Sequence, residues 1–204
     1  MIFAWEDSRR AFRDAADHFV QTAARVEDRW DAPGLGEWDV RALVGHTSRS
    51  LLTVETYLAR PAAAVEVQSA ADYFRATSAA AAGAGVAQRG RDAGEALGSH
   101  PSRALVDLAE RVLALVDGCR GDELVTTFAG GMRLSDYLPT RTFELAVHTA
   151  DLDVALGLPV DLPATAATQA LHLVTELALT QGLAGPLLLS ATGRPGLAPG
   201  SSVL

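Results

Sequence analysis

Apolar residues recur every three or four positions along most of the chain, which is the pattern of helices that bury one face. The pattern predicts helices over residues 3–29, 39–59 and 164–182, and a further helix that begins at Ser102. Residues 62–98 contain much Ala and Gly and few large apolar side chains, so we expect short, lightly packed helices in a long crossover outside the core. The periodicity therefore predicts a mainly α-helical protein.

Two shorter segments depart from helical spacing. Residues 123–134 alternate between apolar and polar positions, and we expect them to form a hairpin that turns at Gly130 and Gly131. The apolar run that follows Gly185 predicts one short strand, and the Gly- and Pro-rich residues after it predict a partly mobile ending.

The helix predicted over residues 134–157, with Ser135 as its expected N-cap, carries its charges in an unusual place. At about 100° per residue, four functional side chains fall into one narrow stripe, namely Arg141, Glu144, His148 and Asp151. Apolar residues flank this stripe on both sides, whereas a surface helix places its charges opposite its apolar face. The stripe is therefore expected to point into the protein. The opposite face carries Thr142, Ala146, Thr149 and Asp153.

A buried acid and a buried imidazole need partners, because unpaired buried charge is costly. Glu144 and His148 are four residues apart, so their side chains can converge on one point. A divalent metal at that point would satisfy both, and so would a hydrogen bond between them, and this helix alone leaves the two interpretations open. His172 and Glu176 form a rival pair with the same spacing. His46 has small neighbours that leave room for a ligand, although a single His in a helix is more often structural.

Composition and charge narrow the range of functions. The 204 residues are 49% hydrophobic and 21% charged, as in globular proteins, and the net charge of −8 argues against a nucleic-acid partner and against binding to anionic membranes. Cys119 is the single cysteine, which excludes an internal disulfide, and we expect it to be inert. We expect His18 to be solvated.

Common hydrolase, nucleotide-binding and zinc-protease motifs are absent. The chain shows neither a signal peptide nor an apolar run of membrane-spanning length, so a cytoplasmic protein is expected.

Two segments carry a family resemblance. WDVRALVGH, residues 38–46, resembles the W-[ST]-V-[RK]-x-[LV]-x-x-H segment of the mycothiol-dependent maleylpyruvate isomerase family, which is part of the DinB-like metalloprotein superfamily. RTFELAVHTADLDVALG, residues 141–157, resembles the R-x-x-E-x-x-x-H-x-x-D-L-x-x-A-L-G helix of the same family. The resemblance implies a four-helix bundle with a long crossover over residues 1–158. The apolar pattern predicts a short helix and strand extension over residues 159–204.

The resemblance also implies a metal site. By position, the ligands of a divalent metal, zinc or alternatively nickel, would be His46, Glu144 and His148. Asp151 and Arg141 match the family motif too, and we expect them to orient the ligands. The alternative for Asp151 is an ion pair with an Arg on a neighbouring helix. The rival His and Glu pair matches no ligand position of the family.

The activity that the resemblance implies is the attack of a metal-activated thiol on an electrophilic substrate. Mycothiol would be the co-substrate, and the reaction would be an isomerisation or a thiol transfer. A metal-dependent hydrolase and a stress or ligand-binding module without turnover are the alternatives. Family members have a substantial C-terminal domain that helps to bind the thiol, whereas residues 159–204 are expected to form a much shorter extension. A monomer or a homodimer would be compatible with such a bundle.

Overall fold

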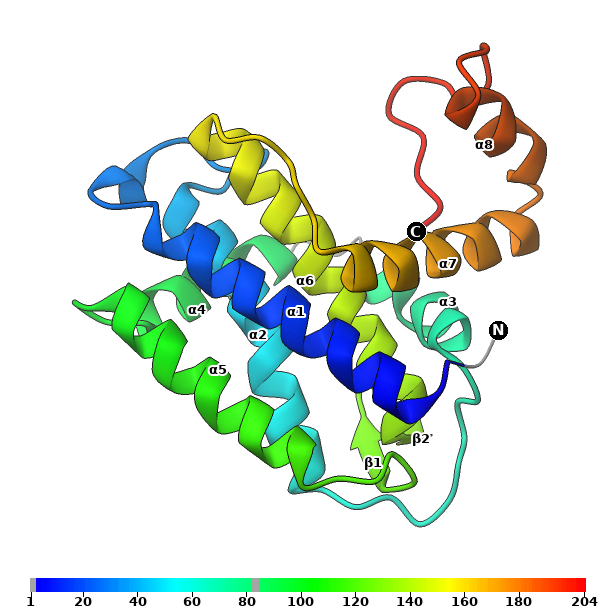
Figure 1. Cartoon of the computed structure of the whole chain (residues 1–204), viewed down its shortest axis with the longest axis horizontal. Helices are drawn as coiled ribbons and strands as arrows, with labels where there is room; N and C mark the ends of the chain where they lie inside the picture. The colour runs from blue at the N-terminus through cyan, green and yellow to red at the C-terminus, as the bar shows by residue number, and fades with distance from the viewer. Residues whose placement is uncertain (1–2, 82–84) are drawn as a thin grey trace.

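Four long helices form the core of this computed structural model, which describes residues 3–81 and 85–204 (Figure 1). The bundle consists of α1 (Trp5–Ala24), α2 (Val40–Leu58), α5 (Pro101–Asp117) and α6 (Leu134–Leu156). Their apolar faces meet in one continuous core, so the predicted mainly α-helical fold and the DinB-like bundle are confirmed. Asp39 is the N-cap of α2, and its side chain accepts a hydrogen bond of 2.7 Å from the backbone N–H of Ala42.

The long crossover between α2 and α5 contains α3 (Ala70–Ala81) and α4 (Gly85–Ala96). The prediction that this segment packs lightly is wrong for α4, because glycines let its backbone approach α2 closely. A Cβ atom at Gly45 would lie 2.1 Å from the backbone N of Gly94, and a Cβ at Gly94 would lie 2.6 Å from the carbonyl O of Arg41. The small residues of the crossover therefore create a tight helix contact.

Helix α6 lies between the other elements and is buried on several sides, since it contacts α1, α2, α3 and α7. It begins at Leu134, at the start of the predicted range, and its N-cap is Arg133, two residues earlier than the predicted Ser135. Helix α5 likewise begins earlier, because Pro101 fits the first helical position and moves the cap to His100 in place of Ser102.

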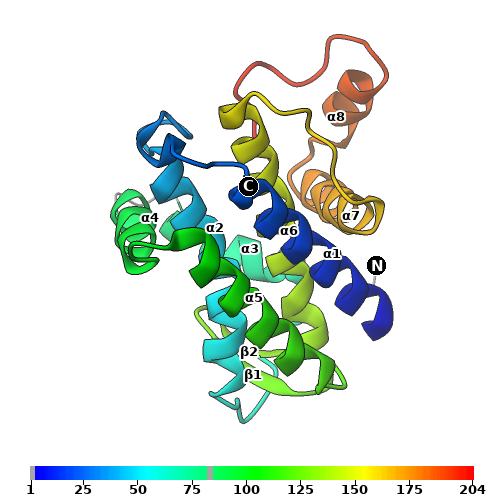
Figure 2. The ribbon, with the colours of Figure 1, turned by 60° about the vertical axis from the view of Figure 1, so that its left-hand side comes forward.

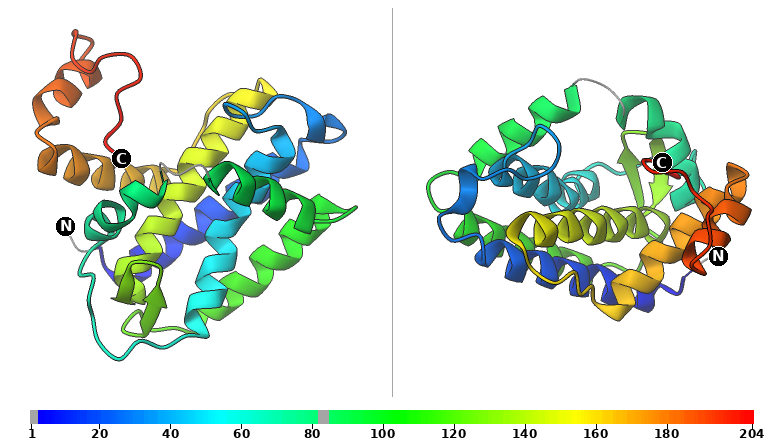
Figure 3. Two further views of the ribbon diagram at one scale, coloured as in Figure 1. Left: turned by 180° about the vertical axis from the view of Figure 1, so that it is seen from behind. Right: turned by 90° about the horizontal axis from the view of Figure 1, so that it is seen from above.

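A short hairpin, β1 (Leu124–Thr127) and β2 (Gly130–Arg133), precedes α6, and Figure 3 shows it at the end of the bundle where α6 begins. The hairpin is antiparallel as predicted, with Thr127 opposite Gly130. The turn consists of Phe128 and Ala129 and not of the two glycines, which begin β2. Gly130 directly follows the turn and has a φ of 122°. Glycine adopts such a positive φ readily and other residues do not, which explains why a glycine occupies this position.

The face of α6 opposite the polar stripe is buried against α1. Thr22 of α1 donates a hydrogen bond of 3.2 Å to Asp153, which is only 2% exposed. His18 Nε2 lies 3.5 Å from the second carboxylate oxygen of Asp153, so the prediction that His18 is solvated is wrong. Helix α1 also ends at Ala24, earlier than predicted, because Glu27 adopts a positive φ of 57° that interrupts helical geometry.

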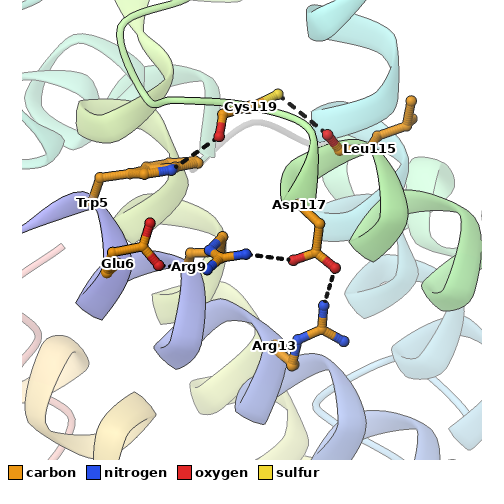
Figure 4. A network of polar contacts seen from close by, with 7 residues as sticks. All are labelled: Trp5, Glu6, Arg9, Arg13, Leu115, Asp117 and Cys119. Carbon is orange, nitrogen blue, oxygen red and sulfur yellow. Dashed lines mark hydrogen bonds and ion pairs between the residues drawn. The ribbon is translucent and has the colours of Figure 1, made fainter.

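Polar contacts join the start of α1 to the end of α5 (Figure 4). Asp117 accepts hydrogen bonds from Arg9 and Arg13, and Arg9 also pairs with Glu6. The Trp5 indole N–H donates to the carbonyl of Cys119. Burial is the main cause that raises the pKa of the Cys119 thiol. The thiol is therefore protonated near neutral pH, as expected for an inert cysteine.

Residues 159–204 form α7 (Ala164–Thr180), α8 (Ala184–Ala191) and a tail. Helix α7 packs against α1 and α6, and Figure 2 shows α7 and α8 on the opposite side of the bundle from α4. The short strand predicted after Gly185 is wrong, because these residues form α8. The proposed boundary between residues 158 and 159 stays a prediction. Within the described ranges, no helix combines the length and the apolar character that crossing a bilayer would need.

Candidate metal centre

Two core helices bring together the three residues expected to bind a metal. His46 lies on α2, and Glu144 and His148 lie one turn apart on α6. One potential ligand atom from each residue lies within 4.8 Å of the others, and each residue is half-buried. No other group of three such side chains converges in this way in the described part of the chain.

The His148 ring is fixed between two carboxylates of its own helix. Its Nδ1 lies 3.0 Å from Asp151 Oδ2, and its Nε2 lies 3.2 Å from Glu144 Oε2. Burial alone would lower the pKa of His148, but the hydrogen bonds and charges of Asp151 and Glu144 outweigh it and raise the pKa to about 9. Burial would likewise raise the pKa of Glu144, yet the hydrogen bond from His148 and the charge of Arg141 lower it to about 2.

His46 is held by stacking, and the described residues make no hydrogen bond to its ring. Its ring lies 4.6 Å from the Trp38 ring and meets the His148 ring edge to face at 4.7 Å between centroids. Burial, followed by the positive charge of His148, lowers the pKa of His46 to about 4, so the imidazole is neutral near pH 7. Its Nδ1 is buried and has no hydrogen-bond partner in the described residues. A neutral imidazole without competing partners is suited to metal binding.

The chemistry of this donor set fits a divalent metal. Two imidazoles and a carboxylate are a common ligand set of catalytic zinc, and three protein ligands leave a position open. Ligands at about 2.0–2.1 Å from a tetrahedral ion lie about 3.3 Å apart, close to the 3.2 Å between His148 Nε2 and Glu144 Oε2. Asp151 accepts from the other ring nitrogen of His148, which is the arrangement that fixes a ligating histidine in metalloproteins.

Arg141 lies beside the cluster without a hydrogen bond to it. Its Nε donates to Thr140 at 2.9 Å, and its guanidinium lies 5.3 Å from the centroid of the Tyr73 ring and 5.1 Å from that of Tyr137. Among the described residues, neither Glu144 nor any other carboxylate lies within ion-pair distance of this guanidinium. The influence of Arg141 on the ligands is therefore electrostatic, and its predicted orienting role stays a prediction. Asp151 contacts His148 and not the Arg of a neighbouring helix.

The cluster opens into a cavity of about 590 Å³, which is large enough for a small molecule. The lining includes three arginines, which are Arg49, Arg89 and Arg141. It also includes aromatic side chains from several segments, namely Trp38, Tyr57, Tyr73, Phe74 and Phe128. None of these aromatics is assigned to the site by the sequence pattern, although Tyr73 and Phe74 stand out as two of the few large side chains of the crossover.

The rival pair His172 and Glu176 does not form a metal centre. The His172 Nδ1–H donates to the Thr168 carbonyl at 2.9 Å, and the ring packs edge to face against Phe3. Both residues line a separate cavity of about 510 Å³, where no third ligand joins them among the described residues.

The fold and this cluster together define the class: a DinB-like helical bundle in which α2 and α6 present a His, Glu and His set to an internal cavity. The family model described as mycothiol maleylpyruvate isomerase N-terminal domain matches residues 9–153, so the chain belongs to this family. The matched range covers the bundle except for the first residues of α1 and the last residues of α6, and it contains all five predicted site residues. No curated protein and no solved structure gives a significant match.

Proposed function

We propose that this protein is a divalent-metal-dependent enzyme that uses a low-molecular-weight thiol, mycothiol by family, against an electrophilic substrate. The reaction would be an isomerisation or a thiol transfer. The observation that carries the proposal is the convergence of His46, Glu144 and His148 on one point that opens into a cavity of small-molecule size. Family membership supports the thiol as co-substrate.

Each residue of the cluster has a distinct role in this proposal. His46, Glu144 and His148 would hold the ion, and Asp151 would keep the Nδ1 proton of His148 in place so that Nε2 is free to bind. A bound zinc or nickel ion would supply Lewis-acid chemistry, which lowers the pKa of a coordinated thiol and generates a nucleophile at neutral pH.

The cavity wall supports the same chemistry. Arg141 places a fixed positive charge near Glu144, and Arg49 and Arg89 add further positive charge to the lining. These charges favour an anionic nucleophile and attract anionic groups of a ligand. The aromatic side chains of the wall offer apolar contact surface to a bound ligand. A reducing cytoplasm, in which a small thiol stays reduced, is the compartment that we propose for this reaction.

Elemental analysis of protein purified without chelator or affinity metal tests the metal centre. We expect about one zinc or nickel ion per chain, lost in His46→Ala and in His148→Ala. His172→Ala is the matched control, because His172 lies outside the cluster, and it should retain the metal. Metal-free native protein, or loss of metal in the control alone, would contradict the ligand assignment.

Turnover assays then separate the proposed reaction from its alternatives. Consumption of an electrophile, such as a conjugated double bond or an epoxide, should depend on both the thiol and the metal. Metal-dependent turnover without thiol would indicate a hydrolase instead. Metal binding without turnover for any thiol tested would indicate a ligand-binding module.

A further inference from the structure

The tail that follows α8 returns to the bundle. Figure 1 shows it running from α8 back to the side of α7, and the Val203 side chain packs against the apolar cluster that joins α3, α6 and α7. The Gln181 Nε2 donates a hydrogen bond of 2.6 Å to the Val203 carbonyl. The last residues of the described chain are therefore attached to the bundle at a defined place.

This attachment places Leu204 in the wall of the metal cavity. Leu204 lines the same cavity as His46 and His148, and it remains 54% exposed. Two more exposed apolar side chains line this cavity. Phe128 at the hairpin turn is 69% exposed, and Leu35 before α2 is 39% exposed. Three segments that are distant in sequence thus contribute exposed apolar side chains to one lining.

The tail is held less firmly than the rest of the wall. The Leu197 backbone N–H donates to the Ser190 hydroxyl, which ties the chain to α8 up to that point. Beyond Leu197, the one hydrogen bond that links the described tail to the bundle is that between Gln181 and Val203, and Pro199 and Gly200 precede the attached residues. Segments with so few contacts open at low free-energy cost.

We propose that residues 201–204 are a movable wall of the metal cavity and determine which ligands reach the cluster. When the tail is attached, Leu204 narrows the cavity and offers apolar contact to a ligand. When it is released, the cavity is open on the side of α3 and α7. The functional meaning of this wall rests on the proposed function, since it takes the cavity as the path to a metal centre.

Cysteine labelling measures the attachment of the tail independently of metal. In a Cys119→Ser background, Thr77→Cys places one thiol in the lining of the cavity on α3, and iodoacetamide reports its accessibility. Val203→Asp replaces the apolar anchor with a charge and should raise the labelling rate about tenfold, because a released Leu204 no longer narrows the access of the reagent to this half-buried position. Gln181→Ala removes one hydrogen bond and should raise the rate less.

Leu188→Asp is the matched control, because Leu188 is 66% exposed on α8 and lies outside the cavity lining, so the labelling rate should stay unchanged. Val86→Cys on α4 provides a second labelling position in the same lining if Thr77→Cys alters the fold. Equal rates in Val203→Asp and its parent would overturn the proposal. Metal content, measured on the same samples, should not change in Val203→Asp. The labelling rates therefore test the movable wall, and the metal content separately tests the metal centre.

Discussion

The imidazole of His148 can hold a proton or a metal ion at Nε2, but not both. Because Asp151 and Glu144 raise the pKa of His148 to about 9 in the metal-free protein, a metal must displace a proton at neutral pH. Apparent metal affinity should therefore rise about tenfold per pH unit from pH 6.5 toward 9 and then level off. Competition with a chromophoric chelator across this range measures the slope. A flat profile above pH 7 would contradict the proton competition.

The same raised pKa of His148 predicts that the metal-free protein becomes less stable as the pH rises, whereas its metal affinity increases. The pairing of His148 with Asp151 and Glu144 contributes stability that is fully present below the unfolded pKa of about 6.5. This contribution should be lost as the pH rises through about 9. Thermal unfolding in chelator at pH 7 and at pH 10 measures it, and His172→Ala should behave like the native protein.

The carboxylate of Asp151 should matter for metal affinity although it is not a ligand. Asp151→Asn keeps the size of the side chain but removes the charge that accepts the Nδ1 proton of His148. Metal affinity should fall about 10- to 100-fold, as for other partners of ligating histidines. Glu176→Gln, which changes a carboxylate outside the cluster, should leave affinity unchanged. Equal affinities of Asp151→Asn and the native protein would argue against the positioning role.

The spacing along one helix predicted part of the site, because Glu144 and His148 are neighbours on any α-helix. The same spacing could not distinguish them from His172 and Glu176, since the third residue of the cluster comes from another helix. The inclusion of His46 depended on the family resemblance. The contribution of Tyr73 to the cavity depends on how α3 docks onto α6, which no local pattern specifies.

At the scale of elements, the contact between α2 and α4 depends on glycine. Gly94→Ala would place a methyl group 2.6 Å from the Arg41 carbonyl, so the two helices would have to separate. The free energy of unfolding should fall by about 1–3 kcal/mol, as in other overpacked interfaces. Chemical denaturation measures it, with Gly185→Ala on α8 as control, because a Cβ there meets no atom within 4 Å. A loss of stability equal to that of the control would contradict this account of the interface.

Elements with a regular apolar face were predictable, and those without one were not. Helices α1, α2, α5 and α7 follow from periodicity, because each buries one stripe against the bundle. Residues 186–189 form a continuous apolar run, which periodicity cannot assign, and in α8 none of them is buried. The pairing of His18 with Asp153 was missed because it joins two helices that are distant in sequence.

For the whole molecule, a bound ion would add a direct link between α2 and α6, which already pack against each other in the core. An ion that binds only the folded state, at a free concentration of 100 times its Kd, should stabilise it by about 2.7 kcal/mol. Thermal unfolding with zinc and with chelator should therefore differ by several degrees in the native protein. The difference should vanish in His46→Ala and persist in His172→Ala.

The ligand atoms of the cluster and the walls of its cavity come from different parts of the chain. His46, Glu144 and His148 belong to α2 and α6, whose positions are fixed by the bundle core. Much of the wall comes from α3, α4, the hairpin turn and the tail, which lie around that core. Under the proposed function, reactivity and selectivity would therefore be physically separable in this architecture. Changes in the surrounding segments would then retune which molecules are accepted while the cluster keeps its geometry.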